Sequence, residues 1–138
     1  MIRQLYRLRW IEISNIPDDE LLWRSVYKKD QIYKNGRPKP AFFRDKSGLS
    51  CDLAKFSTPE RSRRGFADPP WPAEAGLVEF SRRDVRDAKS DVKHKPIATP
   101  RNYAHCQLDV PLDKKGEQHM ADAARWRIEQ RLKKVLAA

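Results

Sequence analysis

The N-terminal part of the chain alternates apolar and polar side chains in the way that is typical of strands. Residues 5–13, LYRLRWIEI, keep a period of two throughout and predict a first strand with two different faces. Residues 21–27, LLWRSVY, are consistent with a strand, but the acidic residues before them also favour a short helix, and the pattern leaves both open. Asn-Gly and two prolines in residues 34–40 predict a turn and an extended, non-helical segment.

The centre of the chain carries clearer start and stop signals. Residues 42–56, FFRDKSGLSCDLAKF, predict a hairpin with Lys46-Ser47-Gly48 at its tip. Ser57-Thr58-Pro59-Glu60 provides a capping hydroxyl, a proline suited to the first helical position and an acid near the positive helix end, so we expect a helix of roughly two turns before Gly65. The proline-rich residues 66–76 predict a surface loop, in which Trp71 either packs onto the core or binds a partner.

The next segments again alternate between strand and helix. Residues 77–80 predict a brief strand, and Ser81 is placed to cap a helix over residues 82–88 with Asp84 in a capping-box position. Residues 92–97 and 104–110 then predict two further strands, linked by a segment that contains Pro100.

The C-terminal residues 117–136 have the periodicity of an amphipathic helix. Apolar side chains recur every three or four residues and line one stripe, which consists of Met120, Ala124, Ile128, Leu132, Val135 and Leu136. Trp126 projects from the opposite flank of such a helix. Three roles fit that position: stacking on a nucleic-acid base, docking a partner protein, or packing on another part of the same chain.

These elements predict an α+β fold with a small mixed or antiparallel sheet, two short helices and a long C-terminal amphipathic helix. The 138 residues fit one domain, 1–138, with one modest core. No segment approaches the roughly 18 consecutive apolar residues that a spanning helix needs, and the N-terminus lacks the apolar core of a signal peptide. We therefore expect a cytoplasmic protein with no membrane partner. Cys51 and Cys106 lie in apolar segments without metal-ligand spacing, which favours buried, reduced thiols.

The net charge of +10 changes the picture because it is concentrated. Residues 28–64 hold eleven Lys and Arg against four Asp and Glu, a net of +7. Such an excess on one face would bind polyanions, although small basic proteins need not bind nucleic acid specifically. The candidate phosphate-binding residues are Arg37, Lys39, Arg44, Arg61, Arg63, Arg64, Lys93, Lys95 and Arg101. Trp71 and Trp126 are the candidate partner-binding residues.

Residues 92–108, VKHKPIATPRNYAHCQL, contain the strongest candidates for chemistry. If His94 and His105 met across neighbouring strands, they would form the paired imidazoles that ribonuclease-type acid and base catalysis uses, with Lys95 or Arg101 stabilising charge and Tyr103 as a further donor. The alternative is that both histidines lie at a partly exposed rim and bond backbone carbonyls. The spacing of the histidines matches no standard metal-ligand pattern. We expect neither a metal nor a cofactor.

Two stretches of the chain resemble known groups of proteins. Residues 21–60, followed by residues 92–108, resemble small uncharacterised bacterial proteins that share a GRP segment, an AFFRD segment and a proline-flanked histidine, which implies a shared domain. Leu22-Trp23-Arg24 and Gly36-Arg37-Pro38 are similar to an early strand and a later Gly-Arg segment of RES-type ADP-ribosyltransferase-like proteins. That resemblance implies that Arg24 contacts NAD phosphates and that Tyr27 or Tyr33 stacks on the nicotinamide.

The sequence thus leaves three functional hypotheses. The first, which the charge favours, is an accessory protein that binds the phosphate backbone of nucleic acid, largely without sequence preference, within a larger complex. The second is a small nuclease or ADP-ribosyltransferase-like enzyme. The third is a protein-protein interaction module that binds no nucleic acid.

Overall fold

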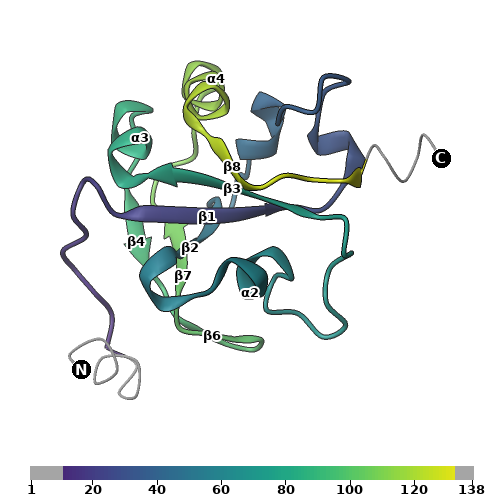
Figure 1. The fold of residues 1–138 in the computed structure, drawn as a ribbon. Coiled ribbons are helices and arrows are strands. Elements are labelled where there is room, and N and C mark those ends of the chain that lie inside the picture. The colour runs from purple at the N-terminus through teal and green to yellow at the C-terminus, as the bar shows by residue number, and fades with distance from the viewer. Residues whose placement is uncertain (1–10, 133–138) are drawn as a thin grey trace.

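A computed structural model of the chain describes residues 11–132 and contains the sheet and helices of an α+β fold (Figure 1). Six strands form one antiparallel sheet in the order β4-β7-β2-β1-β3-β8, and two more form a small hairpin. The sheet strands are β1 (Leu21–Val26), β2 (Ser50–Leu53), β3 (Gly76–Ser81), β4 (Val92–His94), β7 (His105–Leu108) and β8 (Arg125–Ile128). The hairpin pairs β5 (Ile97–Ala98) with β6 (Arg101–Asn102), and the α-helices are α2 (Pro59–Arg63), α3 (Arg82–Asp87) and α4 (Lys114–Ala123). Three short 3-10 helices are η1 (Lys29–Gln31), η2 (Pro40–Phe43) and η3 (Ala54–Phe56).

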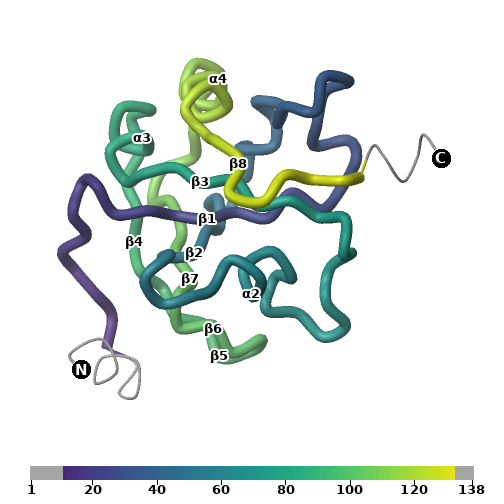
Figure 2. The backbone as a smooth tube through the Cα atoms, in the orientation of Figure 1, coloured from purple at the N-terminus to yellow at the C-terminus, as the bar shows by residue number. Residues whose placement is uncertain are grey.

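The sheet has two faces with different roles. On one, the core face, Leu22 and Val26 of β1 lie beside Phe80 of β3 and Leu53 of β2, and all four are fully buried. η2 completes this layer, since Phe43 packs edge-on against Phe80 with ring centroids 6.0 Å apart. Figures 1 and 2 show α3 and α4 together on one side of the molecule and α2 with the β5–β6 hairpin on another.

The opposite face, the α2 face, carries the alternate residues of the same strands. Trp23 and Ser25 of β1 belong to it, and the Ser25 hydroxyl donates to the Arg63 carbonyl at 2.8 Å, which fastens α2 to the sheet. Asp52 pairs with Trp23 on one side and with His105 on the other, so these three residues share this face. The period of two therefore divides each strand between a main core and a second, more polar layer.

Several predictions from the sequence are confirmed. The helix after Thr58 is capped by the Thr58 hydroxyl, which accepts from the Arg61 N–H at 3.2 Å. Residues 21–26, for which the sequence left strand and helix open, form a strand. Ser81 and Asp84 form the expected capping box at α3. Residues 92–94 and 105–108 pair as antiparallel strands, and the loop before β3 has no regular structure. Both cysteines are buried and free.

The prediction of one helix over residues 117–136 is wrong. Helix α4 ends at Ala123, Ala124 is extended, and residues 125–128 form β8 along the free edge of β3. The periodicity of residues 117–136 does not show that residues 125–128 pair with a strand distant in sequence. The backbone pairing of β8 with β3 outweighs the helical pattern of these residues. Trp126 is therefore a strand residue, half-buried against the main core, and residues 133–136 of the predicted helix lie outside the described chain.

Two further predictions, the hairpin over residues 42–56 and the strand over residues 5–13, do not match the described structure or lie partly outside it. Residues 42–56 do not form a hairpin, because Phe42 and Phe43 belong to η2 and only Ser50–Leu53 is a strand, which pairs with β1 and β7. Of the predicted strand at 5–13, residues 5–10 lie outside the described residues and 11–13 are irregular.

In the part of the chain that the structure describes, no helix has the length and apolar character needed to span a bilayer.

We expect Met120→Ala to lower the free energy of unfolding by about 2–5 kcal/mol, because the Met120 side chain on α4 is fully buried and its loss leaves a cavity. The exposed Lys115 on the same helix is the control, and Lys115→Ala should change stability by less than about 0.5 kcal/mol. Denaturant unfolding followed by circular dichroism measures both. Equal values for the two variants would show that α4 does not pack on the core.

Candidate active site

A pocket of about 360 Å³ lies on the α2 face of the sheet. Its floor comes from β1, β2 and β7, and its walls come from α2, the loop after α2 and the β5–β6 hairpin. This volume lies in the range that small-molecule sites occupy. The charged and polar residues that line it come from segments distant in sequence, and they include Arg24, Ser25, Asp45, Ser50, Asp52, Ser62, Asn102 and His105.

Asp52 is the acid of the pocket. Its carboxylate accepts from the Ser62 hydroxyl at 2.7 Å and from the Asn102 side-chain amide at 2.8 Å. Burial raises the pKa of the Asp52 carboxyl above its usual value, and these two hydrogen bonds lower it only in part. Asn102 is itself fixed, because its carbonyl oxygen accepts from the Ala104 N–H. Asp52 is thus held in one orientation and favours the protonated form more than an exposed carboxyl would.

Arg24 is a charged residue at a core-face position of β1, between the buried Leu22 and Val26. Strands β1 and β2 pair at Trp23 but not beyond it, and Arg24 lies where they separate. Its Nη1 donates to the Ser50 carbonyl at 2.7 Å, and its guanidinium lies over the Phe42 ring, 4.8 Å from the centroid. The side chain therefore joins the two strands where their backbone ladder has ended.

The hydrogen bonds of Arg24 are incomplete. Its Nε is buried without a partner, and among the described residues no carboxylate lies within ion-pair distance of the guanidinium. Burial lowers the pKa of Arg24, yet a guanidinium stays protonated at neutral pH. The carboxylates of Asp45 and Asp52, which line the same pocket, attract this cation only from beyond ion-pair distance. The guanidinium can therefore still pair with an anion that enters the pocket.

His105 projects into the pocket from β7 and contacts Ser50. One ring nitrogen, Nδ1, lies 2.7 Å from the Lys95 carbonyl, and the other, Nε2, lies 3.2 Å from the Ser50 hydroxyl. A carbonyl can only accept, so in the neutral ring Nδ1 carries the hydrogen and Nε2 is left as the acceptor. His105 is thereby oriented as a base toward the pocket.

The wall opposite the sheet is aromatic. Tyr27 and Trp71 stack with ring centroids 4.0 Å apart and an interplanar angle of 15°. Gly65 lies against the Trp71 ring, and its φ of +72° together with the 2.5 Å approach that a Cβ would make explains why only glycine fits there. Trp71 thus packs against Tyr27 and Gly65 on the α2 face, outside the main core, and its role in binding a partner stays a prediction.

The predicted meeting of His94 and His105 does not occur. His94 pairs with Cys106 and not with His105, so the two imidazoles lie on opposite faces of the sheet. His94 is buried rather than at a rim: its Nδ1 accepts from the Ile13 N–H and its Nε2 lies 2.6 Å from the Tyr103 carbonyl. Burial lowers the pKa of His94, which keeps it neutral. Tyr103 packs against His94, and its hydroxyl donates to the Ile11 carbonyl, so neither residue lines the pocket.

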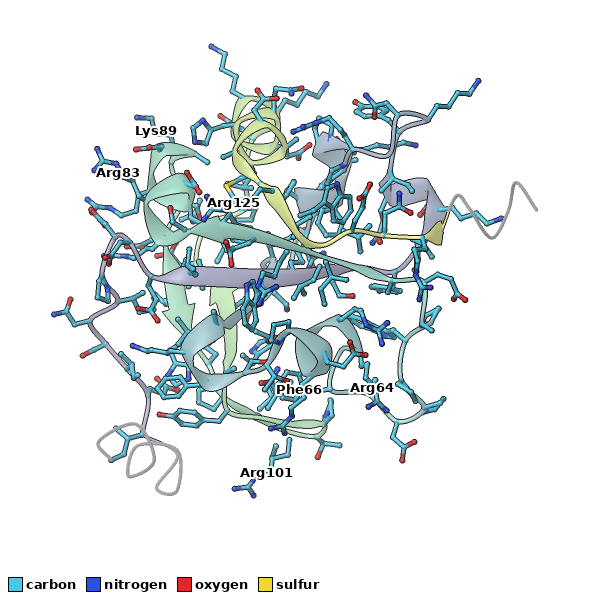
Figure 3. The ribbon with its side chains drawn as sticks, viewed as in Figure 1. Arg64, Phe66, Arg83, Lys89, Arg101 and Arg125 are labelled. Atoms are coloured by element: carbon cyan, nitrogen blue, oxygen red, sulfur yellow. The ribbon has the colours of Figure 1, made fainter. Side chains whose placement is uncertain are left out.

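The candidate phosphate-binding residues differ in their contacts with the rest of the chain. Arg63 is buried and bonds Glu60 and the Pro72 carbonyl, Arg44 pairs with Glu117 at 3.0 Å, and Arg37 donates to the Ala121 carbonyl. Lys39 lies near the Tyr33 ring. Arg37 and Arg44 are exposed despite these contacts, and so are Arg61, Arg64, Lys93, Lys95 and Arg101. Figure 3 shows Arg64 and Phe66 beside α2 and Arg101 at the hairpin, whereas Arg83 and Lys89 lie on the side of α3.

The sequence pointed to only part of this site. His105 was a predicted catalytic residue, and Arg24 and Tyr27 entered through the resemblance to RES-type proteins. Ser50, Asp52, Ser62 and Asn102 were missed. The available signal was the charge of Arg24 and Asp52 inside otherwise buried strands, because an ionisable residue at such a position is costly and marks a function more often than a packing role.

Asp52→Asn should stabilise the fold increasingly as the pH rises. The pKa of Asp52 is higher in the folded than in the unfolded chain, so the native state binds more protons between the two values and loses stability as the pH rises through them. The asparagine variant lacks this loss. Its free energy of unfolding, measured against wild type from about pH 3 to about pH 8, should therefore improve with pH. The exposed Asp122→Asn is the control, and a flat difference for Asp52→Asn would contradict the assignment.

Comparison of the chain with protein-family models, with curated proteins and with solved structures found no match. The two resemblances described from the sequence stay predictions.

Proposed function

We propose that the protein is a small enzyme that cleaves a phosphate ester of nucleic acid in the pocket on the α2 face. The observation that carries this proposal is Arg24, whose guanidinium lines the pocket with an unpartnered Nε and forms no ion pair with any described carboxylate, while Asp45 and Asp52 act on it only from a longer distance. A phosphate in the pocket would supply the negative charge with which this guanidinium can pair. The pocket also contains groups that move protons, which a simple binding site does not need.

The proton-transfer roles follow from the hydrogen bonds. His105 presents Nε2 as an acceptor and is placed to remove a proton from an attacking hydroxyl. Asp52, whose pKa burial raises, is placed to donate a proton to the leaving oxygen. The Arg24 guanidinium stabilises the charge that develops on the phosphate. One group placed to accept a proton and another placed to donate one, within a single pocket, are the pattern that acid and base catalysis requires.

The exposed basic residues around the pocket give the proposal its substrate class. Arg61 lies in α2 and Arg64 at its end, Lys95 precedes the β5–β6 hairpin, and Arg101 is the first residue of β6. Cations at the rim of a pocket bind a phosphate backbone on either side of the reacting ester without reading its sequence. Binding to nucleic acid, which the charge of the chain predicts, then serves to deliver substrate to the pocket.

A second candidate is an enzyme that consumes NAD. Arg24 and Tyr27, which the resemblance to RES-type proteins assigns to NAD phosphates and nicotinamide, both line this pocket. NAD and nucleic acid share the phosphate that Arg24 would bind, and they differ in the bond that breaks.

Activity assays separate the two candidates. Wild-type protein is incubated with short single-stranded RNA, with single-stranded DNA and with NAD, and cleaved oligonucleotide or free nicotinamide is measured. We expect oligonucleotide cleavage, with a loss of at least about 100-fold in Asp52→Asn and His105→Ala because each removes a proton-transfer group. Lys115→Ala on the exposed side of α4 is the control. Nicotinamide release that depends on Asp52 would replace the first candidate with the second, and no turnover of any of the three would refute both.

Binding should depend on salt and on the rim near α2. Affinity for an RNA oligonucleotide should fall steeply between about 50 and 200 mM salt as phosphate contacts release counterions. Arg61→Glu with Arg64→Glu should weaken binding and flatten the salt slope. Arg83→Glu with Lys89→Glu, which changes the same charge on the side of α3, should have a smaller effect. Fluorescence anisotropy measures all three proteins, and equal losses in both double variants would show that binding is not localised at the pocket.

A further inference from the structure

The Ser50 hydroxyl has the contacts of an activated nucleophile. It lies 3.2 Å from His105 Nε2, while His105 Nδ1 is held 2.7 Å from the Lys95 carbonyl. Because that carbonyl fixes the hydrogen on Nδ1, the Ser50 hydroxyl is the donor to Nε2. A hydroxyl, a base that accepts its proton and a third group that orients the base are the three parts that nucleophilic catalysis by serine needs.

The backbone around Ser50 is fixed on both sides. Arg24 Nη1 donates to the Ser50 carbonyl at 2.7 Å, which also brings the guanidinium next to this residue. On the preceding turn, Gln107 donates to the Ser47 and Gly48 carbonyls, and Gly48 has a φ of +105°. Ser50 itself pairs with Gln107 in the ladder between β2 and β7. The hydroxyl is therefore held on a rigid strand end at the pocket, as a catalytic group must be.

Other hydroxyls near the pocket lack these features. Ser62 is buried, shares a hydrogen bond with Ser57, and donates to Asp52 at 2.7 Å, which occupies its proton and holds the acid in place. Ser25 donates to the Arg63 carbonyl and fastens α2. Of the serines that line the pocket, Ser50 alone contacts an imidazole.

We infer that Ser50 is the catalytic nucleophile of the pocket and that the reaction passes through a covalent phosphoserine ester. This inference rests on the proposed function and names a residue and an intermediate for it. The Ser50 oxygen forms a bond to phosphorus, its proton passes to His105 Nε2, and the bond from phosphorus to the leaving oxygen breaks as Asp52 supplies a proton there. Water then attacks the phosphoserine, regenerates the Ser50 hydroxyl and releases the phosphate product, with His105 and Asp52 returning to their starting protonation states.

The inference is tested with a fluorophosphonate, which reports a nucleophilic serine without knowledge of the substrate. The Ser50 oxygen bonds to phosphorus, fluoride leaves, and the serine proton passes to His105 Nε2. We expect one adduct per chain by intact mass spectrometry, mapped to Ser50 by peptide sequencing. Ser50→Ala should abolish the adduct and His105→Ala should slow labelling by at least about tenfold, because the base is lost. Ser14→Ala, which changes an exposed serine of the N-terminal segment, should label like wild type.

The outcomes separate this inference from the proposed function. If folded wild type is not labelled at Ser50, under conditions that label a serine hydrolase completely, the nucleophile is wrong. If Ser50→Ala keeps its oligonucleotide cleavage while Asp52→Asn loses it, the proposed function stands and the covalent route is refuted. Labelling at Ser50 that requires His105, in a protein that cleaves no oligonucleotide, supports the nucleophile and refutes the proposed substrate. Circular dichroism of each variant excludes loss of the fold as the cause.

Discussion

The architecture depends on the contact between the Arg24 guanidinium and the Ser50 carbonyl. The backbone ladder between β1 and β2 ends at Trp23, and the next residue of β1 continues the connection with its side chain instead of its backbone. The same side chain packs on Phe42 and so joins the sheet to the layer that covers its core face. Arg24 thus contacts the core layer at Phe42, bridges β1 and β2 where they separate, and lines the pocket. An apolar residue at this position would pack better, but it would leave the Ser50 carbonyl unbonded and the pocket without a cation.

Burying polar groups on the α2 face lowers the stability of the fold, but it holds those groups in fixed orientations. Asp52 is buried enough to raise its pKa, and a chain of hydroxyls from Ser57 through Ser62 together with the Asn102 amide keeps its carboxylate in one orientation. These bonds hold the acid before any substrate binds, so little reorganisation is needed during a reaction. The main core on the other face, with its fully buried Leu22, Phe80 and Met120, supplies the stability against which this cost is set.

Local chemistry predicted those parts of the fold that local chemistry determines. The caps of α2 and α3 were visible because a hydroxyl and an acid at fixed spacing satisfy the free N–H groups of a helix start wherever it lies. The end of α4 was not visible in the sequence, because Arg125–Ile128 becomes a strand only through pairing with β3, about fifty residues earlier in the chain. Only part of the site was predicted, because the rest of it also depends on strand pairing. His105 carries its own signal, but its meeting with Ser50 and Asp52 requires the order of the sheet, and the pairing of His94 with Cys106 turns the expected partner to the other face.

The aromatic wall of the pocket has a consequence for how the protein can diversify. The floor belongs to strands whose other face is the main core, so a substitution there is constrained from two sides. The wall is formed by α2 and the loop that holds Trp71 against Gly65, and its attachment to the sheet runs through contacts such as the Ser25 hydroxyl with Arg63. Changes in the length and composition of this segment can therefore alter the shape of the pocket, while the groups on the floor and the packing beneath them stay the same.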